Sequence, residues 1–442
     1  MRNKLFNLIA VTAVSAFAFA QQGFTIDEAW QYAVENNVNV KKAKIDQTIA
    51  EQKVKETIGI GLPQVDAQGK YTNYLNVPVQ LLPAEIVGGP AGTYVPVQFG
   101  QKHSGNAALT LSQILFSGSY LVGLESSKAY KETVALATEK TEISVKQGIL
   151  MAYTGVLVTD ENLKTLEENR KVAEKALRDT EATYKVGLIE LQNVEQQQYG
   201  YKSLVANQQN LVRTRDQLAM ALKYLMGYPL NEQIALTSNL ADVVDRNENL
   251  INTAVNPDLS NHIDYRLREN ALKLSELKLK LQRSKYLPTL AAFANTSYNG
   301  NSNSFGDLWK GKWYNTSLWG LQLDIPIFSG FQRKWQTEQA KLDVEKAKLD
   351  LDESSRLLQN NAFSASTDYE NAYNSFKNAE DLIALSSSIY KKEQIKFKEG
   401  MGTSFTLQQA ETQLYDAQRQ YYQAALNLIQ AKTALDEALG KL

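Results

Sequence analysis

Few side chains in this chain have a type and spacing suited to catalysis. The two histidines, His103 and His262, lie far apart in the sequence, and we expect both at the surface rather than acting as a base or a ligand. There is no cysteine, which excludes a thiol nucleophile, a thiolate metal site and a disulfide framework. Gly59-Ile-Gly61 lacks the third glycine of a dinucleotide-binding turn and precedes a strand-like run, so we interpret it as the end of a helix.

Two further partial motifs also fall short of a site. Asp245-x-Asn247-x-Asn249 resembles the start of a calcium loop, but Leu250 replaces the required glycine and Asn256 replaces the bidentate glutamate. Ser275-x-x-Lys278 lies in a helical pattern and lacks the companion motifs of a serine acyl-enzyme. The sequence therefore predicts no catalytic residue, cofactor or metal, and a protein that is not an enzyme.

The first twenty residues have the pattern of a secretory signal. Arg2 and Lys4 precede an apolar run that ends in Ala18-Phe19-Ala20, which predicts a cleaved segment at 1–20. No later run reaches the roughly 20 apolar residues of a membrane-spanning helix. The absence of cysteine argues against a lipid anchor, and a formal net charge of -1 gives no basic footprint for nucleic acid.

The chain carries a long internal repeat. Phe116-Ser117-Gly118 recurs as Phe328-Ser329-Gly330, and a glycine turn inside Tyr184–Leu188 recurs inside Phe397–Met401. A repeat of about 200 residues is too long for a solenoid unit. We therefore predict a duplicated half-protein, with a first repeat at 21–227, a connector at 228–262 and a second repeat at 263–442.

Each repeat contains a long helix followed by a returning helix. Between Phe331 and Glu399 there is neither glycine nor proline, which predicts one continuous helix about 100 Å long. The proline-free run from Ser119 to Val186 predicts its counterpart. The returning helices carry heptads, which are typical of supercoiled helix packing. Their positions are Ala410, Leu414, Ala417, Tyr421, Ala424, Leu428, Ala431, Leu435 and Ala438, and Leu191, Val194, Gln198, Tyr201, Val205, Gln208 and Val212.

Strand pairs precede both long helices. Alternating runs that begin at Pro63, Leu109, Pro288 and Leu321 are long enough for a tilted membrane strand, which needs about 9–11 residues. Aromatic residues crowd this zone, and we predict that they form a belt at the lipid interface. The predicted belt comprises Tyr71, Tyr298, Tyr314, Trp313 and Trp319. A soluble four-stranded sheet with aromatic packing is the alternative for the strands, and an ordinary two-stranded coiled coil is the alternative for the helices.

Counting strands favours an oligomer. A sheet in lipid must close because every backbone polar group there must be paired. Four strands cannot close, and eight strands give a barrel filled by side chains. Three chains would give about twelve strands and twelve helical columns, which leaves a duct. The predicted fold is mostly α with a membrane β part, a trimeric 12-strand β-barrel that continues into a 12-helix α-barrel.

The ordered set of parts, present twice, resembles the TolC-type outer membrane efflux proteins, also called outer membrane factors. The resemblance covers about Thr25 to Leu442 and includes Ala29-Trp-Gln-Tyr-Ala33 followed by Asn36-Asn37, in a helix opened by a Thr25/Glu28 capping box. It implies a homotrimer in the outer membrane of a Gram-negative bacterium that extends into the periplasm. It also implies a passive export duct for small molecules or proteins, docked on a periplasmic adaptor and an inner-membrane pump of RND or ABC type.

The resemblance also assigns roles to residues at the two glycine turns. These turns, which we call the tip, would meet the adaptor; they comprise Val186, Gly187 and Leu188 with Glu399, Gly400 and Met401. Four positions just beyond them would line the entrance, and we call them the entrance residues: Thr406, Gln409, Asn193 and Gln196. Some members of the family carry carboxylate rings at the entrance. The neutral side chains of this chain would bind cations only weakly.

Two matters stay open at the level of sequence. The loop from Pro78 to Gly105 is 13 residues longer than its counterpart, and it would either cover part of the outer mouth or remain a mobile surface loop. A structural periplasmic coiled-coil protein is the main functional alternative, because it would need no strands facing lipid. A secreted enzyme has no supporting constellation of residues.

Overall fold

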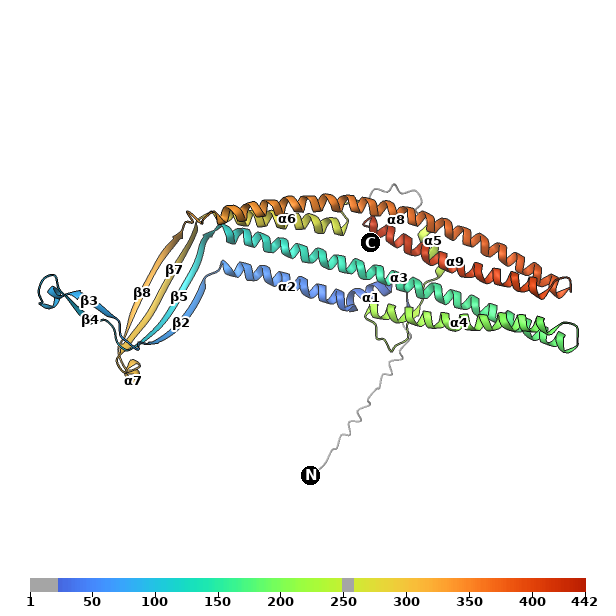
Figure 1. Ribbon diagram of the computed structural model, residues 1–442, viewed down its shortest axis with the longest axis horizontal. Helices are drawn as coiled ribbons and strands as arrows, with labels where there is room; N and C mark the ends of the chain where they lie inside the picture. The colour runs from blue at the N-terminus through green and yellow to red at the C-terminus, as the bar shows by residue number, and fades with distance from the viewer. Residues whose placement is uncertain (1–22, 249–257) are drawn as a thin grey trace, which may run out of the picture. The chain divides into compact units, whose positions relative to one another are not determined.

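The computed structural model describes residues 23–248 and 258–442 (Figure 1). The predicted signal segment at 1–20 and the Asn249 position of the calcium-loop motif lie outside these residues. The described chain is mostly helical. Its helices are α1 (Ile26–Asn36), α2 (Val38–Ile60), α3 (Gly118–Lys185), α4 (Leu191–Met226), α5 (Leu240–Glu248), α6 (Ile263–Ser284), α7 (Phe305–Leu308), α8 (Gln332–Lys398) and α9 (Ser404–Ala438).

The strands fall into three sheets. They are β1 (Gly23–Phe24), β2 (Gln64–Asn73), β3 (Val79–Pro83), β4 (Tyr94–Gln98), β5 (His103–Ser117), β6 (Ala235–Leu236), β7 (Thr289–Ser302) and β8 (Trp313–Asp324). The chain divides into two compact units. Unit 1 combines Met1–Lys44, Thr138–Ile263 and Ser355–Leu442, and unit 2 combines Ile45–Ala137 and Asp264–Ser354. Each unit takes segments from both halves of the sequence.

The two long helices form as the sequence predicts. α8 is unbroken over 67 residues, and α3 is unbroken over 68 residues although it contains Gly123, Gly148 and Gly155. Gly59-Ile-Gly61 does end a helix, since α2 stops at Ile60. In the described part of the chain, no helix has both the length and the apolar character needed to cross a membrane.

The heptad prediction is confirmed for α9 and met only in part in α4, where Val194, Tyr201, Val205 and Gln208 are half-buried. Most of the predicted α9 positions are buried, among them Ala410, Leu414 and Leu428. In α4 the predicted Leu191 and Val212 are exposed, and the buried face instead includes Gln197 and Leu204, each one residue before a predicted position. The buried Gln197 gives no apolar signal, and the prediction placed its neighbour Gln198 on the face instead.

The main sheet joins strands from both halves of the chain. Its order is β2-β5-β7-β8, and all its pairs are antiparallel. The predicted pairs β2·β5 and β7·β8 are present, and β5 with β7 adds the link between the halves. In this register Tyr71, Gly105, Gly300 and Trp313 lie side by side on one row across the four strands. A long sheet of this kind is built entirely within unit 2.

The segment predicted as a loop after Pro78 contains a hairpin. β3 and β4 pair antiparallel from Val79↔Gln98 to Pro83↔Tyr94, with a short 3-10 turn at Ala84–Val87 between them. Prolines at two positions in these strands argue against a central strand, which is why the pattern reads as a loop. The two-stranded hairpin tolerates them because each of its strands has one unpaired edge.

A hydrophobic core of buried residues lies within unit 1. The predicted capping box opens α1: Thr25 Oγ1 accepts from Glu28 N, and the Glu28 carboxylate accepts from Thr25 N at 2.8 Å. Tyr153 of α3 is fully buried and donates its hydroxyl proton to Phe24 O at 2.8 Å. The expectation that His262 lies at the surface is wrong, because only 4% of it is exposed, next to the Gly440 turn.

Candidate functional site

The main sheet has two chemically different faces. Because successive side chains of a strand point to opposite faces, the register assigns every residue to one of them. The apolar face carries Val65, Ala67, Gly69, Tyr71, Gly105, Ala107, Leu109, Leu111, Leu290, Ala292, Ala294, Tyr298, Gly300, Trp313, Trp319, Leu321 and Leu323. The polar face carries Gln64, Asp66, Gln68, Lys70, Asn106, Thr110, Ser112, Asn295, Ser297, Asn299, Tyr314, Thr316, Gln322 and Asp324.

Several residues depart from this separation, among them Gln113 on the apolar face and Leu318 on the polar face. On the apolar face, Thr296 and Ser317 lie 2.9 Å apart through their hydroxyl oxygens, and Asn315 Nδ2 donates to Thr296 Oγ1 at 3.1 Å. On the polar face, Phe293 packs against Gly320, where a Cβ would lie 2.9 Å from the ring. A sheet with one apolar and one polar face suits a wall between lipid and water.

The polar face forms hydrogen bonds across its central strands. Asn106 Nδ2 donates to Asn299 Oδ1 at 2.7 Å, and Asn295 Nδ2 donates to Thr110 Oγ1 at 2.7 Å. Both pairs join β5 to β7, the two strands that connect the halves of the chain. These side chains therefore keep their orientation toward one side of the sheet.

Four of the five predicted belt residues lie on the apolar face. Tyr71 and Trp313 occupy one row of the sheet, and Tyr298 lies two residues before Gly300 of that row. Trp319 lies six residues further along β8, which corresponds to roughly 20 Å of strand. Tyr314 lies on the polar face, next to Asn299.

An aromatic cluster around the predicted belt residues Tyr71 and Trp313 lies at the same end of the sheet. Tyr71 Oη lies 2.8 Å from His103 Nδ1, and Phe305 packs edge-on against both rings. Trp309 continues the cluster from Phe305 to Trp313. The sequence does indicate this cluster, because the short stretch between β7 and β8 has aromatic residues at both ends of 305–309, Phe305 and Trp309.

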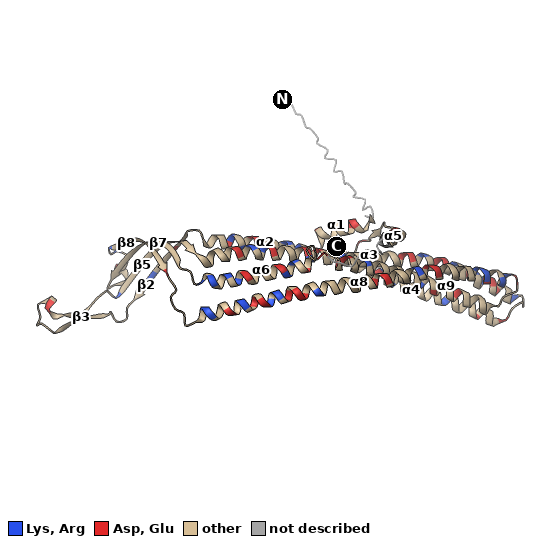
Figure 2. Ribbon diagram, turned by 90° about the horizontal axis from the view of Figure 1, so that it is seen from above, with Lys and Arg blue, Asp and Glu red and all other residues tan. Residues whose placement is uncertain are grey.

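The helices of unit 2 lie in the same order as the strands. Ion pairs join α2 to α3, α3 to α6 and α6 to α8; they are Lys131–Glu51 (2.9 Å), Lys273–Glu132 (2.7 Å), Lys280–Glu125 (2.6 Å) and Lys278–Asp343 (2.7 Å). Figure 2 shows basic and acidic residues mixed along α6 and α8. The motif residue Lys278 therefore serves as an exposed ion-pair partner between helices.

Both edge helices of unit 2 expose large apolar side chains. α8 carries Trp335, Leu342 and Leu349 at intervals of seven residues, each more than half exposed. α2 carries Ile45 and Ile49, which are also more than half exposed. The edge strands β2 and β8 likewise pair on one side only within the described residues. Both edges of this unit are thus left uncovered by the chain itself.

The two turns of the tip share one construction. Gly187 and Gly400 have φ angles of 77° and 72°, a left-handed conformation that a glycine adopts without a Cβ penalty. In both turns the following residue donates its N–H back to the helix: Leu188 N to Thr183 O at 3.2 Å, and Met401 N to Lys396 O at 2.9 Å. This pattern satisfies the last carbonyls of α3 and α8 and leaves the tip side chains in solvent.

The tip presents apolar side chains outward. Val186, Leu188 and Met401 are exposed by 69%, 76% and 74%, with the Glu399 carboxylate beside them. Exposed apolar residues gathered at one end of a helical bundle are typical of a protein contact.

The structure brings two of the four entrance residues together. Ser404 Oγ, at the start of α9, donates to Gln196 Oε1 at 2.8 Å or to Asn193 Oδ1, which is also within hydrogen-bond distance. Ser404 is buried and connects α9 to α4 just behind the tip. Sequence analysis missed it because a single serine at a helix start gives no pattern.

The other two entrance residues lie on the exposed side of α9. Thr406 and Gln409 are both exposed and are one helical turn apart. Thr406 also completes a capping box with Thr403, whose Oγ1 accepts from Thr406 N at 3.1 Å. Thr406 thus fixes the start of α9 while its side of the helix faces away from the core.

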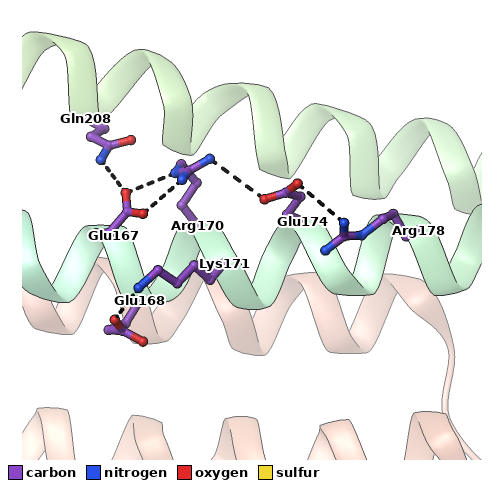
Figure 3. A network of polar contacts seen from close by, with 7 residues as sticks. All are labelled: Glu167, Glu168, Arg170, Lys171, Glu174, Arg178 and Gln208. Carbon is purple, nitrogen blue, oxygen red and sulfur yellow. Dashed lines mark hydrogen bonds and ion pairs between the residues drawn. The ribbon is translucent and has the colours of Figure 1, made fainter.

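A network of charged and polar side chains links α3 to α4 in the part of α3 that precedes the Gly187 turn (Figure 3). Arg170 Nη2 donates to Glu167 Oε1 at 2.9 Å, and Gln208 Nε2 of α4 donates to Glu167 Oε2 at 2.7 Å. These bonds hold the pKa of Glu167 at about 2, with the Arg170 bond the larger cause. Glu174 continues the line between Arg170 and Arg178 at 3.8 and 3.7 Å.

The opposite side of α3 is tied to α9. Asn169 Nδ2 donates to Gln418 Oε1 at 2.6 Å, and Thr165 Oγ1 lies 2.6 Å from Tyr422 Oη. Helix α3 therefore contacts both α4 and α9 in unit 1. In the described residues, no group of His, Asp and Glu side chains could hold a metal ion.

Comparison with known proteins identifies the family of this chain. A family model described as "Outer membrane efflux protein" matches residues 29–228 and 259–441. The chain belongs to the outer membrane efflux protein family. The resemblance seen in the sequence is thereby confirmed. This efflux family protein is located in the outer membrane of a Gram-negative bacterium and extends into the periplasm. Its family consists of channel proteins rather than enzymes.

Individual relatives are distant but extensive. Outer membrane protein TolC of Salmonella enteritidis is 22% identical over 450 residues, which cover 99% of this chain and 86% of that protein. Outer membrane protein TolC of Vibrio cholerae is 21% identical over 344 residues, which cover 76% of this chain and 77% of that protein. The fold of the CmeC outer membrane channel of Campylobacter jejuni is similar, with a TM-score of 0.72, 16% identity and coverage of 94% of this chain and 85% of that chain.

Proposed function

We propose that this outer membrane efflux protein is the passive exit duct of a tripartite efflux or type I secretion system, built as a homotrimer. The observation that carries the proposal is the shared order of strands and helices in unit 2. Strands run β2-β5-β7-β8, and the helices that continue them run α2-α3-α6-α8. Each copy therefore offers one β2/α2 edge and one β8/α8 edge to its neighbours.

Closure of the sheet needs further copies. Unpaired backbone groups at the edges of β2 and β8 must find partners in lipid. Bacterial barrels have about eight or more strands, and three copies would supply about twelve. In such a barrel the apolar face meets lipid and the polar face lines the duct. Asp66, Lys70 and Asp324 would then be the charged groups of its wall.

The helices would close in the same way. The exposed stripe of α8, with Leu342 at its centre, would pack against α2 of the next copy. Twelve helical columns would then continue the twelve strands. We attribute the matching contributions of the two halves, 21–227 and 263–442, to an internal duplication, joined by the connector at 228–262.

Aromatic residues would set the position of the barrel in the membrane. Tyr71, Trp313 and Tyr298 would lie at the outer interface, together with Trp309 of the aromatic cluster. Trp319 would lie deeper along the lipid-facing surface, while Tyr314 would face the duct.

The tip would be the docking site for a periplasmic adaptor. Its exposed Val186, Leu188 and Met401 suit a hydrophobic contact. Beyond it, Thr406 and Gln409 would line the entrance, and Asn193 and Gln196 would hold α9 through Ser404. The energy for transport of small molecules or proteins would come from an inner-membrane pump of RND or ABC type.

The mass of the assembly tests the proposal. After extraction of the outer-membrane fraction with detergent, the detergent-corrected mass should equal three chains of 49.4 kDa less any segment removed on export. Washing with salt alone should release none of it. A monomer, or a coiled-coil dimer that salt releases, would instead support the periplasmic spacer.

A further inference from the structure

The buried face of α9 contains two ionisable side chains with opposite surroundings. Only 8% of Glu411 and 4% of Lys432 are exposed. Lys432 forms an ion pair with Asp436, one turn further along α9. Among the described residues, no lysine, arginine or histidine forms an ion pair with Glu411. A buried charge without a counter-charge is costly, so Glu411 is the less favourably placed of the two as an ion.

Two tyrosine hydroxyls are the titratable groups that face Glu411 in the described structure. Tyr415 of α9 donates its hydroxyl proton to Glu411 Oε1 at 2.5 Å. Tyr390 lies on α8, the helix packed alongside, and Gln394 Nε2 donates to its hydroxyl oxygen at 3.4 Å. Both hydroxyls are neutral at physiological pH, so neither compensates an ionised carboxylate.

Burial dominates the titration of this group. It raises the pKa of Glu411, and the hydrogen bond from Tyr415 offsets only part of that increase. Burial together with the Glu411 charge raises the pKa of Tyr390 to about 12. The packed arrangement therefore favours a protonated, neutral Glu411.

Glu411 lies along the stretch of α9 that carries the entrance residues. It is two turns from Ser404 on the same buried side of the helix, whereas Thr406 and Gln409 occupy the exposed side. On α4, Gln197 follows Gln196, which bonds Ser404; Gln197 is buried, and its amide Nε2 has no hydrogen-bond partner in the described structure. The buried polar side chains near the start of α9 are therefore less completely hydrogen-bonded than those of the charged network on α3.

We propose that Glu411 is a positioning residue for the entrance: its protonated form keeps α9 packed against α8, and its ionisation loosens α9 so that the entrance opens more readily. This inference rests on the proposed export duct. As the pH rises above the ordinary pKa of a glutamate, Glu411 loses its proton in the loosened, hydrated arrangement at a lower pH than in the packed arrangement. The packed state therefore weakens as the pH rises from about 4.5 to the raised pKa of Glu411, and stays weakened above it.

Conductance in planar bilayers between pH 4.5 and pH 8 tests the proposal. Because one proton per chain is coupled to packing, the ratio of loosened to packed entrances should rise up to tenfold per pH unit within that window. The wild-type conductance should therefore increase with pH. Glu411→Gln should remain at the low-pH level throughout, since the amide stays neutral and its oxygen still accepts from Tyr415.

Two control variants separate titration from a merely structural role. Asp416→Asn removes an exposed carboxylate of the same helix, one that pairs with Arg419, and should leave the wild-type pH profile unchanged. Tyr415→Phe removes the bond that lowers the pKa of Glu411, and should move the midpoint of the profile to higher pH. A wild-type profile retained in Glu411→Gln would overturn the proposal.

Thermal unfolding in detergent provides a readout independent of conduction. Glu411→Gln should be more stable than the wild type at pH 7.5 and equal to it at pH 4. If the wild type is trimeric but shows no conductance at any pH, the proposed duct function is wrong. The role of Glu411 is then tested by the unfolding measurements alone. Equal stabilities at both pH values would then count against it.

Discussion

At the scale of single residues, the informative positions are those where a polar side chain is buried. Ser404, Gln197 and Glu411 all lie near the start of α9, and none belongs to an apolar pattern. A pattern-based reading assigns such positions to solvent, which also explains the wrong expectation for His262. By contrast, Gly187 and Gly400 were recognisable in the sequence because only a residue free to adopt positive φ suits those turns.

We expect Ser404→Ala to destabilise the contact between α9 and α4. Its hydroxyl is buried and serves the amide oxygens of Asn193 and Gln196, so its removal should cost about 1–2 kcal/mol of stability. Thermal unfolding in detergent would measure the loss. Thr412→Ala is the matched control, because the exposed Thr412 hydroxyl bonds only the carbonyl of its own helix at Gln408. Equal effects of the two changes would argue against the contact.

At the scale of elements, the sequence predicted those with an uninterrupted signal. α8 was predictable because no glycine or proline interrupts 332–398. The four long strands were predictable because apolar and polar residues alternate over part of each, although β5 and β8 begin before the predicted runs at Leu109 and Leu321. The face of α4 was not, since Gln197 replaces an apolar residue there and Leu191 is left exposed. The β3–β4 hairpin was missed because Pro83 and Pro96 lie inside its strands. Pairing of β5 with β7 joins residues about 190 positions apart, which no local pattern reveals.

The two faces of the main sheet should respond differently to the same charge. Ala294 lies on the apolar face and Ala291 on the polar face of β7. Ala294→Arg would place a charge in lipid at a cost of about 2–4 kcal/mol per copy, whereas Ala291→Arg would face water. The amount of heat-resistant protein in purified outer membranes should fall sharply for the first change only. Equal recovery of both variants would contradict the assignment of the faces.

At the scale of the whole molecule, the sequence argument for several copies came from counting strands. The same argument could not identify the surfaces that meet, because edges become visible only once the order of the elements is known. Unit 2 places the unpaired strand edges and the exposed apolar stripes at the same two borders. Because the sheet and the helices leave uncovered surface at the same two borders, we expect several copies to form a ring rather than an isolated chain.

Leu342→Lys should weaken the assembly without unfolding the chain. The side chain is 64% exposed in the single chain, so a lysine costs little there, but covering it in the ring would lose about 2 kcal/mol per copy. Mass measurement in detergent at decreasing protein concentration should show earlier dissociation. Lys348→Glu, which changes a charge on α8 away from the stripe, should leave the mass unchanged. Dissociation of both variants at one concentration would place the contact elsewhere.

The two borders of unit 2 differ from each other, and this has a genetic consequence. A ring built from unlike borders is joined head to tail, so a copy damaged at one border can still enter through its other border. Such a copy would carry its defect into rings that also contain intact copies. With equal amounts of intact and damaged chains, only about one ring in eight would be wholly intact under random assembly. A border mutation would therefore act dominantly, whereas a chain unable to fold would leave the intact copies to assemble among themselves.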